Sequence, residues 1–325
     1  MTPLQFETRH RSQWQRCAEQ LGELQRLGAQ RARHRQLAAA LTVNYLECCE
    51  QLALARSRGY PAYIVEPLEQ LTYDAHRLIY RRHEWGLGRL RLLALRDFPR
   101  QVRALRLQVL LAALAFGVPM LLVGALIYWR PDLIGSVYST RGAAELEEMY
   151  SSSAEALGRT RSAGTDWTMF GYYIRNNIGI AFQCFAGGVF LGFGSLFYLI
   201  VNGAIIGAVA GYVTARGLGG NFYPFIATHS AFELTAIVLA GAAGLRMGAA
   251  LLAPGRLSRG QALVQAGREA VVVVYGVIAL LLLAAALEAF WSSSLWLPVS
   301  VKFAVASLAW VLVIGYLVRQ ARDAD

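Results

Sequence analysis

Two residues one helical turn apart carry the clearest chemical signal in the sequence. His229 and Glu233 are four positions apart, so they share one face of a helix, and Glu233 lies inside a long apolar stretch. A charged carboxylate is costly in lipid, so Glu233 is expected to face protein or water, either paired or protonated. Three roles remain open: a hydrogen-bonded pair that locks the structure, a site for proton or ion movement, and a metal site.

For the metal site, the H-x-x-x-E spacing supplies only two donors and differs from the H-E-x-x-H pattern of zinc proteases, so neither a metal nor a cofactor is predicted. The polar residues nearest to completing a cluster are Asn176, Asn177 and Asn202. Glu288 and Lys302 lie near the outer ends of their apolar stretches, where snorkelling or pairing with each other would satisfy them. No Ser/His/Asp arrangement stands out, so the chain is not predicted to be an enzyme.

These residues lie in a chain that is too apolar for a soluble protein. Of its 325 residues, 56% are hydrophobic and 16% are charged, against about 25% charged in a typical soluble domain. Residues 1–106 hold 18 Arg and 10 acids, and residues 107–325 hold 12 Arg, one Lys and 11 acids. This composition excludes a soluble enzyme, a disordered chain and a fibrous protein. It predicts an all-α polytopic membrane protein with an N-terminal cytoplasmic helical domain.

Six apolar stretches predict about six transmembrane helices. They cover 107–129, 178–201, 203–215, 225–245, 270–290 and 297–318. A helical crossing needs about 20 apolar residues, so five stretches qualify by length. The stretch 203–215 is short and follows Asn202-Gly203, a turn-forming pair, so it is either a compressed span or a re-entrant half-helix. We favour a short span.

The arginines predict how these spans are oriented. Cytoplasmic connections carry an excess of Lys and Arg, and the 246–269 connection holds four Arg. Six crossings place this connection and both termini in the cytoplasm, with residues 130–174 outside. The lipid bilayer is therefore the first predicted partner.

The polar N-terminal part is predicted to be a separate domain, residues 1–104, followed by the membrane bundle, residues 105–325. Apolar residues recur at helical spacing over about 31–57 and 63–83, separated by Gly59-Tyr60-Pro61, and a shorter helix is expected over about 9–27. Residues 86–106 alternate Leu with Arg, which fits either a helix lying on anionic lipid headgroups or ordinary flanking charge. No nucleic-acid module is present, so no nucleic-acid partner is predicted.

Glycines repeat at four-residue intervals in the membrane part. Such spacing lets a neighbouring backbone approach closely, and it predicts helix packing or a substrate path lined by backbone. The residues are Gly188, Gly192, Gly203, Gly207, Gly211, Gly244 and Gly248. Because 203–215 is short, its glycine face is expected to be covered by protein, either within the chain or in a homo-oligomer, with a dimer favoured.

At these residues the chain resembles a known family. The resemblance rests on short motifs in a fixed order: Tyr173 with Asn176-Asn177, Gly187-Gly188 with Gly192, Asn202-Gly203 with Gly207, and His229 with Glu233. Together with Ala75-His76 and Phe98-Pro99-Arg100, these motifs resemble the stage II sporulation protein M (SpoIIM) family over about residues 30–290. The usual Pro-His-Gly of that family stands here as Thr228-His229-Ser230. The Arg-rich composition favours the branch found in non-sporulating bacteria.

The resemblance implies a scaffold of the cell envelope without established catalytic residues. It also implies a location in the bacterial inner membrane, which makes residues 130–174 periplasmic. In spore formers the founding member anchors peptidoglycan-degrading enzymes at the membrane, and related proteins in non-sporulating bacteria are often encoded beside MoxR-type AAA+ ATPases. We therefore expect an anchoring or assembly protein that positions peptidoglycan-remodelling or AAA+ partners. The alternative is a proton-coupled transporter or channel that uses the intramembrane pair His229 and Glu233.

Overall fold

The computed structural model describes residues 1–26, 31–79, 87–151, 163–294 and 297–319. Every regular element in these ranges is a helix, which confirms the all-α prediction. The chain divides into two compact units, Met1–Arg89 and Leu90–Asp325. Each unit is described by itself below.

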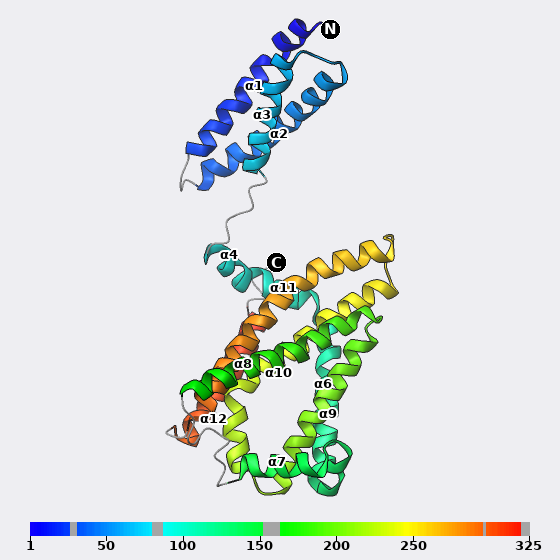
Figure 1. Ribbon diagram of the computed structural model, residues 1–325, viewed down its shortest axis with the longest axis vertical. Helices are drawn as coiled ribbons and strands as arrows, with labels where there is room; N and C mark the ends of the chain where they lie inside the picture. The colour runs from blue at the N-terminus through cyan, green and yellow to red at the C-terminus, as the bar shows by residue number, and fades with distance from the viewer. Residues whose placement is uncertain (27–30, 80–86, 152–162, 295–296, 320–325) are drawn as a thin grey trace. The chain divides into compact units, whose positions relative to one another are not determined.

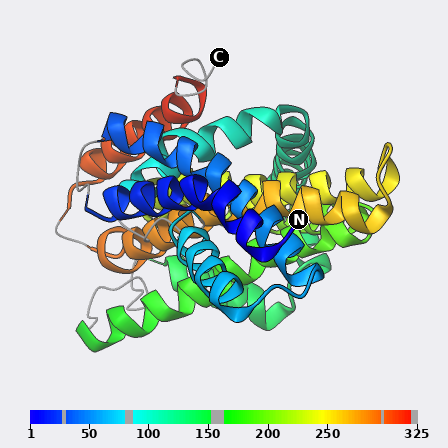
Figure 2. The ribbon, with the colours of Figure 1, turned by 90° about the horizontal axis from the view of Figure 1, so that it is seen from above.

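Unit 1 is a bundle of three helices, α1 (Pro3–Arg26), α2 (Arg31–Ser57) and α3 (Ala62–Ile79), which lie side by side in Figures 1 and 2. Its core joins Cys17 of α1, Leu41 and Cys48 of α2 and Ala75 of α3. The predicted stop between α2 and α3 is present, because Gly59 has a φ of +61°, a left-handed conformation that glycine adopts without strain. The spacing of the apolar residues thus gives this unit a core of its own.

Unit 2 begins earlier than the predicted domain boundary at residue 104. It opens with the end of α4 (Leu87–Leu92), a π-helical turn η1 (Leu93–Asp97) and α5 (Phe98–Ala104). Phe98 and Val102 are buried in the same core as residues of the membrane helices. Their apolar side chains therefore draw residues 90–104 into unit 2.

Among the residues that the structure describes, five helices of unit 2 are long and apolar enough to cross a membrane: α6 (Arg106–Trp129), α9 (Phe193–Ala215), α10 (Gly219–Leu252), α11 with its π-helical end η5 (Arg259–Ser292), and α12 (Val299–Val318 of Val299–Arg319). Large apolar side chains are exposed along α6 and α12, for example Leu121 at 68% and Val311 at 67%. Such exposure is costly in water and expected in lipid. The chain is therefore a multi-pass membrane protein.

The predicted spans 178–201 and 203–215 are wrong. The first helix is α8 (Ala163–Ala186), and the chain then turns through η4 (Gly187–Val189) before α9 begins at Phe193. Leu191 and Gly192 have φ angles of +54° and +88°, which end the helix there. Asn202 instead lies inside α9, where its side-chain amide donates to the Tyr198 carbonyl, 2.8 Å away. The stretch 203–215 is thus the second half of a full-length span.

Close contacts show that α6 and α9 run in the same direction. A Cβ at Gly203 would meet the backbone of Phe116, and a Cβ at Gly211 would meet that of Gly124. Both pairs advance together along the two helices, as Figure 1 also shows.

The same reasoning orients α8, α10 and α11. Trp167 of α8 packs on Phe290 in η5, and Thr228 of α10 bonds to Ser292 in η5, so these three helices meet at one level. Gly188, just after α8, meets Gly244 near the other end of α10. It follows that α8 and α10 run together and that α11 runs against them.

Unit 2 therefore has two ends. At the α5 end lie α5, residues 187–192, the 253–258 connection and the last turns of α12, where Tyr316 donates to the Ala94 carbonyl. At the α7 end lie η2 (Pro131–Ser136), α7 (Thr140–Tyr150), residues 216–218 and η5. In the described part of the chain, six helices run between these ends: α6, α8, α9, α10, α11 and α12. All of them except α8 are apolar enough over a sufficient length to cross a membrane.

Candidate intramembrane polar site

The site is built on the N-terminal half of α10. His229 and Glu233 lie on one face of this helix, and the His229 Nε2 atom is 3.8 Å from a Glu233 carboxylate oxygen. The side chains of the two residues are 5% and 18% exposed. At 3.8 Å the two groups are close, but they do not form a hydrogen bond. The structure brings this pair together as the i, i+4 spacing predicts.

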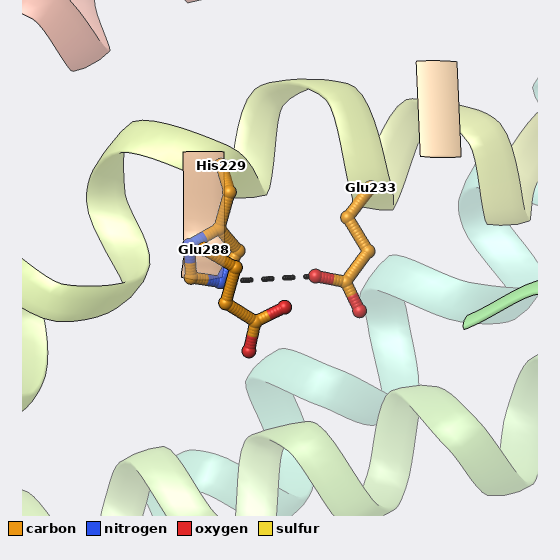
Figure 3. Close-up of side chains that lie close together, drawn as sticks. All are labelled: His229, Glu233 and Glu288. Atoms are coloured by element: carbon orange, nitrogen blue, oxygen red, sulfur yellow. Dashed lines mark ion pairs between the residues drawn. The ribbon is translucent and has the colours of Figure 1, made fainter. Parts of the chain in front are cut away.

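A third titratable group reaches the pair from another helix. Glu288 is in η5, the π-helical turn Leu287–Ser292 that continues α11. One ligand atom each from His229, Glu233 and Glu288 lies within 4.8 Å of the other two, and Figure 3 shows the three side chains directed toward one another. Single π-helical turns occur often at functional sites, where they redirect side chains relative to the α-helical register.

The imidazole of His229 is held from its other side. Its Nδ1 atom lies 3.1 Å from the Ser292 Oγ, which is also 2.7 Å from the Thr228 Oγ1. The Phe225 ring packs edge-on against the imidazole, with the ring centroids 5.6 Å apart. These contacts fix the ring so that Nε2 points toward Glu233.

Lys302 of α12 joins the same region. Its Nζ donates to the backbone carbonyl of Ser292 at 2.8 Å, and the Lys302 residue is only 7% exposed. Lys302 lies near the start of α12, as predicted, but it is buried instead of snorkelling, and its ammonium group ties α12 to η5. Three segments of the chain, α10, η5 and α12, thus converge here.

The three asparagines predicted to complete the cluster take part in other hydrogen bonds. The Asn176 side-chain amide donates to the Asn177 side chain at 2.9 Å, and Asn202 bonds within α9. Asn177 is 2% exposed, and its Nδ2 atom has no hydrogen-bond partner among the residues that the structure describes. No described hydrogen bond joins any of the three to His229.

Sequence reasoning placed Glu288 outside the site and did not single out Ser292 and Thr228 as partners of His229. Glu288 was visible as a charge within an apolar stretch, a signal that marks functional residues in membranes. Its separation from His229 along the chain hid the contact, because a helical repeat says which residues share a face but not which helix that face meets. The π-helical turn that carries Glu288 and Ser292 has no signature in the apolar pattern.

The predicted packing glycines meet one another within this chain. Gly188 faces Gly244, and Gly192 faces Gly248, so the two four-residue repeats interlock. Gly207 faces the backbone of Met120 in α6, between the contacts of Gly203 and Gly211 described above. The face formed by these three glycines of α9 is therefore covered by α6 and is not open to a second copy.

Comparison with known proteins gives two matches along the chain. The family described as SpoIIM, Stage II sporulation protein M, matches residues 109–293. A domain of unknown function, DUF8413, matches residues 4–81. Searches of curated proteins and of solved structures found no significant match.

The first match includes five residues of the site: Thr228, His229, Glu233, Glu288 and Ser292. It does not cover Ala75-His76 or Phe98-Pro99-Arg100, which the resemblance assigns to the same family, and Ala75-His76 lies within the second match. The first match spans more than half of the 325 residues and coincides with the helices from α6 to η5. The chain therefore belongs to the SpoIIM family of membrane proteins.

Proposed function

We propose that this protein is a non-catalytic assembly protein of the bacterial inner membrane, which holds partners on both sides of the bilayer. The observation that supports the proposal is that polar helical structure both precedes and follows the first span of a closely packed membrane bundle. Unit 1 precedes the first span, and η2 with α7 follows it.

The charges at the two ends of unit 2 support an orientation in which the α5 end faces the cytoplasm. The α5 end has nine described arginines against two acids: Arg91, Arg96, Arg100, Arg103, Arg106, Arg246, Arg256, Arg259 and Arg268, with Asp97 and Glu269. Apart from Lys302 and Glu288 of the polar site, the α7 end has three described arginines against five acids: Arg130, Arg141 and Arg216, with Asp132, Glu145, Glu147, Glu148 and Asp166. By the positive-inside rule the α5 end is cytoplasmic, and so are both termini.

Unit 1 is then the cytoplasmic docking module. No described helix before α6 is long and apolar enough to cross the membrane, so unit 1 stays on the side where α6 begins. On α2, Val43 and Leu46 are 60% and 56% exposed and lie one turn apart. Paired exposed apolar side chains of this kind are suited to a protein partner. The family resemblance suggests a MoxR-type AAA+ ATPase as this partner.

The periplasmic structure is fixed to the bundle by polar contacts. Tyr212 of α9 donates to a Glu147 carboxylate oxygen at 2.5 Å, and the Nε of Arg216 lies 3.0 Å from the same oxygen. Asn221 of α10 donates to the carbonyl of Tyr150 at the end of α7. Held in this way, α7 presents a defined surface, for which the family suggests peptidoglycan-remodelling partners.

Affinity capture from native membranes in mild detergent tests the proposal. The full-length chain should retain soluble proteins in stoichiometric amounts. The double variant Val43→Glu with Leu46→Glu should lose cytoplasmic partners and keep periplasmic ones. Leu4→Glu is the matched control, because Leu4 is 69% exposed on a different helix, α1. This variant should keep both the cytoplasmic and the periplasmic partners. Recovery of the chain with lipid alone would contradict the anchoring role.

A second candidate is a proton-coupled transporter or channel, favoured by the buried meeting of His229, Glu233 and Glu288. Proton pathways through membranes use such intramembrane carboxylates and imidazoles. Proton flux into proteoliposomes should then fall to background with Glu233→Gln, which cannot titrate, while the protein stays folded. Equal flux for empty vesicles, the wild-type protein and the variant would exclude this candidate.

A further inference from the structure

We propose that His229, Glu233 and Glu288 form a binding site for one divalent transition-metal ion of the Zn²⁺ class inside the membrane bundle. The site is independent of the anchoring role and of transport. It rests on the convergence of three ligand atoms from two helical segments, with one ligand atom of each residue within 4.8 Å of the others.

The spacing of the side chains fits ligands that share an ion. Two ligands at about 2.1 Å from a Zn²⁺ ion are about 3.4 Å apart in tetrahedral geometry and at most about 4.2 Å apart. The His229 Nε2 and Glu233 oxygen are 3.8 Å apart, too far for a hydrogen bond and within this range. A contraction of up to about 1.4 Å in the widest pair, through the flexible glutamate side chains, would give the tetrahedral separation.

The contacts behind His229 are those of a metal ligand. Metal-binding imidazoles use one nitrogen for the ion and donate the other N–H to an oxygen, which fixes the tautomer and the ring. Here Nδ1 lies 3.1 Å from the Ser292 Oγ, and Ser292 is itself held by Thr228. With Nδ1 as the donor, the lone pair of Nε2 faces the two carboxylates.

The electrostatics of the site favour a cation. Glu233 and Glu288 bring two carboxylates together in a bundle surrounded by lipid, where each charge is expensive. The ammonium group of Lys302 is directed to the backbone, where it donates to the Ser292 carbonyl. A divalent ion would stabilise both carboxylates and would accept the imidazole nitrogen as its third ligand.

The donor set selects the class of ion. One imidazole nitrogen and two carboxylate oxygens suit Zn²⁺, Mn²⁺ or Fe²⁺, whereas Mg²⁺ and Ca²⁺ prefer sites made of oxygen alone. Three protein ligands leave a fourth position for water or another ligand, as in the open class of zinc sites.

Metal analysis of the purified full-length protein tests the inference. After stripping with a chelator, incubation with Zn²⁺ and desalting, the wild-type protein should retain about one ion per chain by elemental mass spectrometry. Glu288→Gln should retain none. Ser292→Ala, which keeps all three ligands, should weaken binding by about 10–100-fold. Glu145→Gln, the same change at an exposed residue of α7, should bind like the wild type.

A second measurement covers the case in which Glu288→Gln fails to fold. The thermal midpoint of the wild-type protein should rise with Zn²⁺, return on chelation and stay unchanged with Mg²⁺ or Ca²⁺. Co²⁺ should give the visible spectrum of a site with nitrogen and oxygen ligands. Absence of retained metal in the wild-type protein, or equal retention in wild type and Glu288→Gln, would overturn the inference.

Discussion

The packing of α9 against α6 makes a sharp prediction at Gly207. A Cβ at this position would overlap the carbonyl oxygen of Met120 and would lie 2.8 and 2.9 Å from its C and Cα atoms. Real Cβ atoms essentially never come within 3.0 Å of another group. Because the neighbour is backbone, it cannot rotate away, so Gly207→Ala must push the two helices apart.

The expected change in unfolding free energy depends on the cost of overpacking and on helix propensity. Overpacking by one methyl group costs about 1–3 kcal/mol, and the contact with backbone places Gly207→Ala at the upper part of that range. Gly117→Ala, in α6, is the matched control, because a Cβ there has nothing within 4 Å. Helix propensity should stabilise this control by about 0.5–1 kcal/mol. Gly207→Ala gains the same propensity, which therefore cancels, and the two variants should differ by the overpacking cost, about 2–3 kcal/mol in unfolding free energy.

Unfolding in mixed micelles, with a rising fraction of denaturing detergent, measures the difference. Circular dichroism follows the helices, and wild-type protein provides the reference. If Gly207→Ala were as stable as Gly117→Ala, the close approach of α6 and α9 would not exist as described.

Two further predictions concern regions outside the membrane. Tyr212→Phe removes the hydrogen bond to Glu147, which is worth about 1 kcal/mol. Amide hydrogen exchange in α7 should therefore become about fivefold faster. An unchanged exchange rate would show that this hydrogen bond does not hold α7. In unit 1, the hydrogen bond with Cys17 and burial raise the pKa of the Cys48 thiol, which stays protonated at neutral pH. A maleimide should therefore modify the partly exposed Cys49 first and Cys48 only after unfolding, as read by peptide mass spectrometry.

Much of the helical architecture could be predicted from the sequence, because apolar runs of membrane length have few alternative structures. The stretches 107–129 and 297–318 correspond closely to α6 and α12. The helix break at residues 187–192 was missed, since glycines are tolerated within membrane helices and the run 178–201 carries no charge. The contacts of Gly187 with Gly194, and of Gly188 with Gly244, are tertiary and leave no mark in local composition.

The candidate site was predicted only in part for a related reason. His229 and Glu233 are neighbours on one helix, so their spacing alone brings them together. Glu288 comes from a different segment through a π-helical turn, and Lys302 reaches the same turn from α12. The asparagines were chosen for their polarity near span ends, but Asn202 is satisfied by a carbonyl of its own helix. Polar character identifies candidates, and only the packing of helices shows which of them meet.

The central claim of this account is that one chain presents helical structure on opposite sides of the membrane. Cysteine accessibility in intact cells tests it most directly, with Val137→Cys at the α7 end and Leu257→Cys at the α5 end. These residues are 40% and 43% exposed, and the unsubstituted chain provides the baseline. A membrane-impermeant maleimide should label Val137→Cys from outside and Leu257→Cys only after permeabilisation. Labelling of Leu257→Cys in intact cells, or protection of Val137→Cys, would contradict the account.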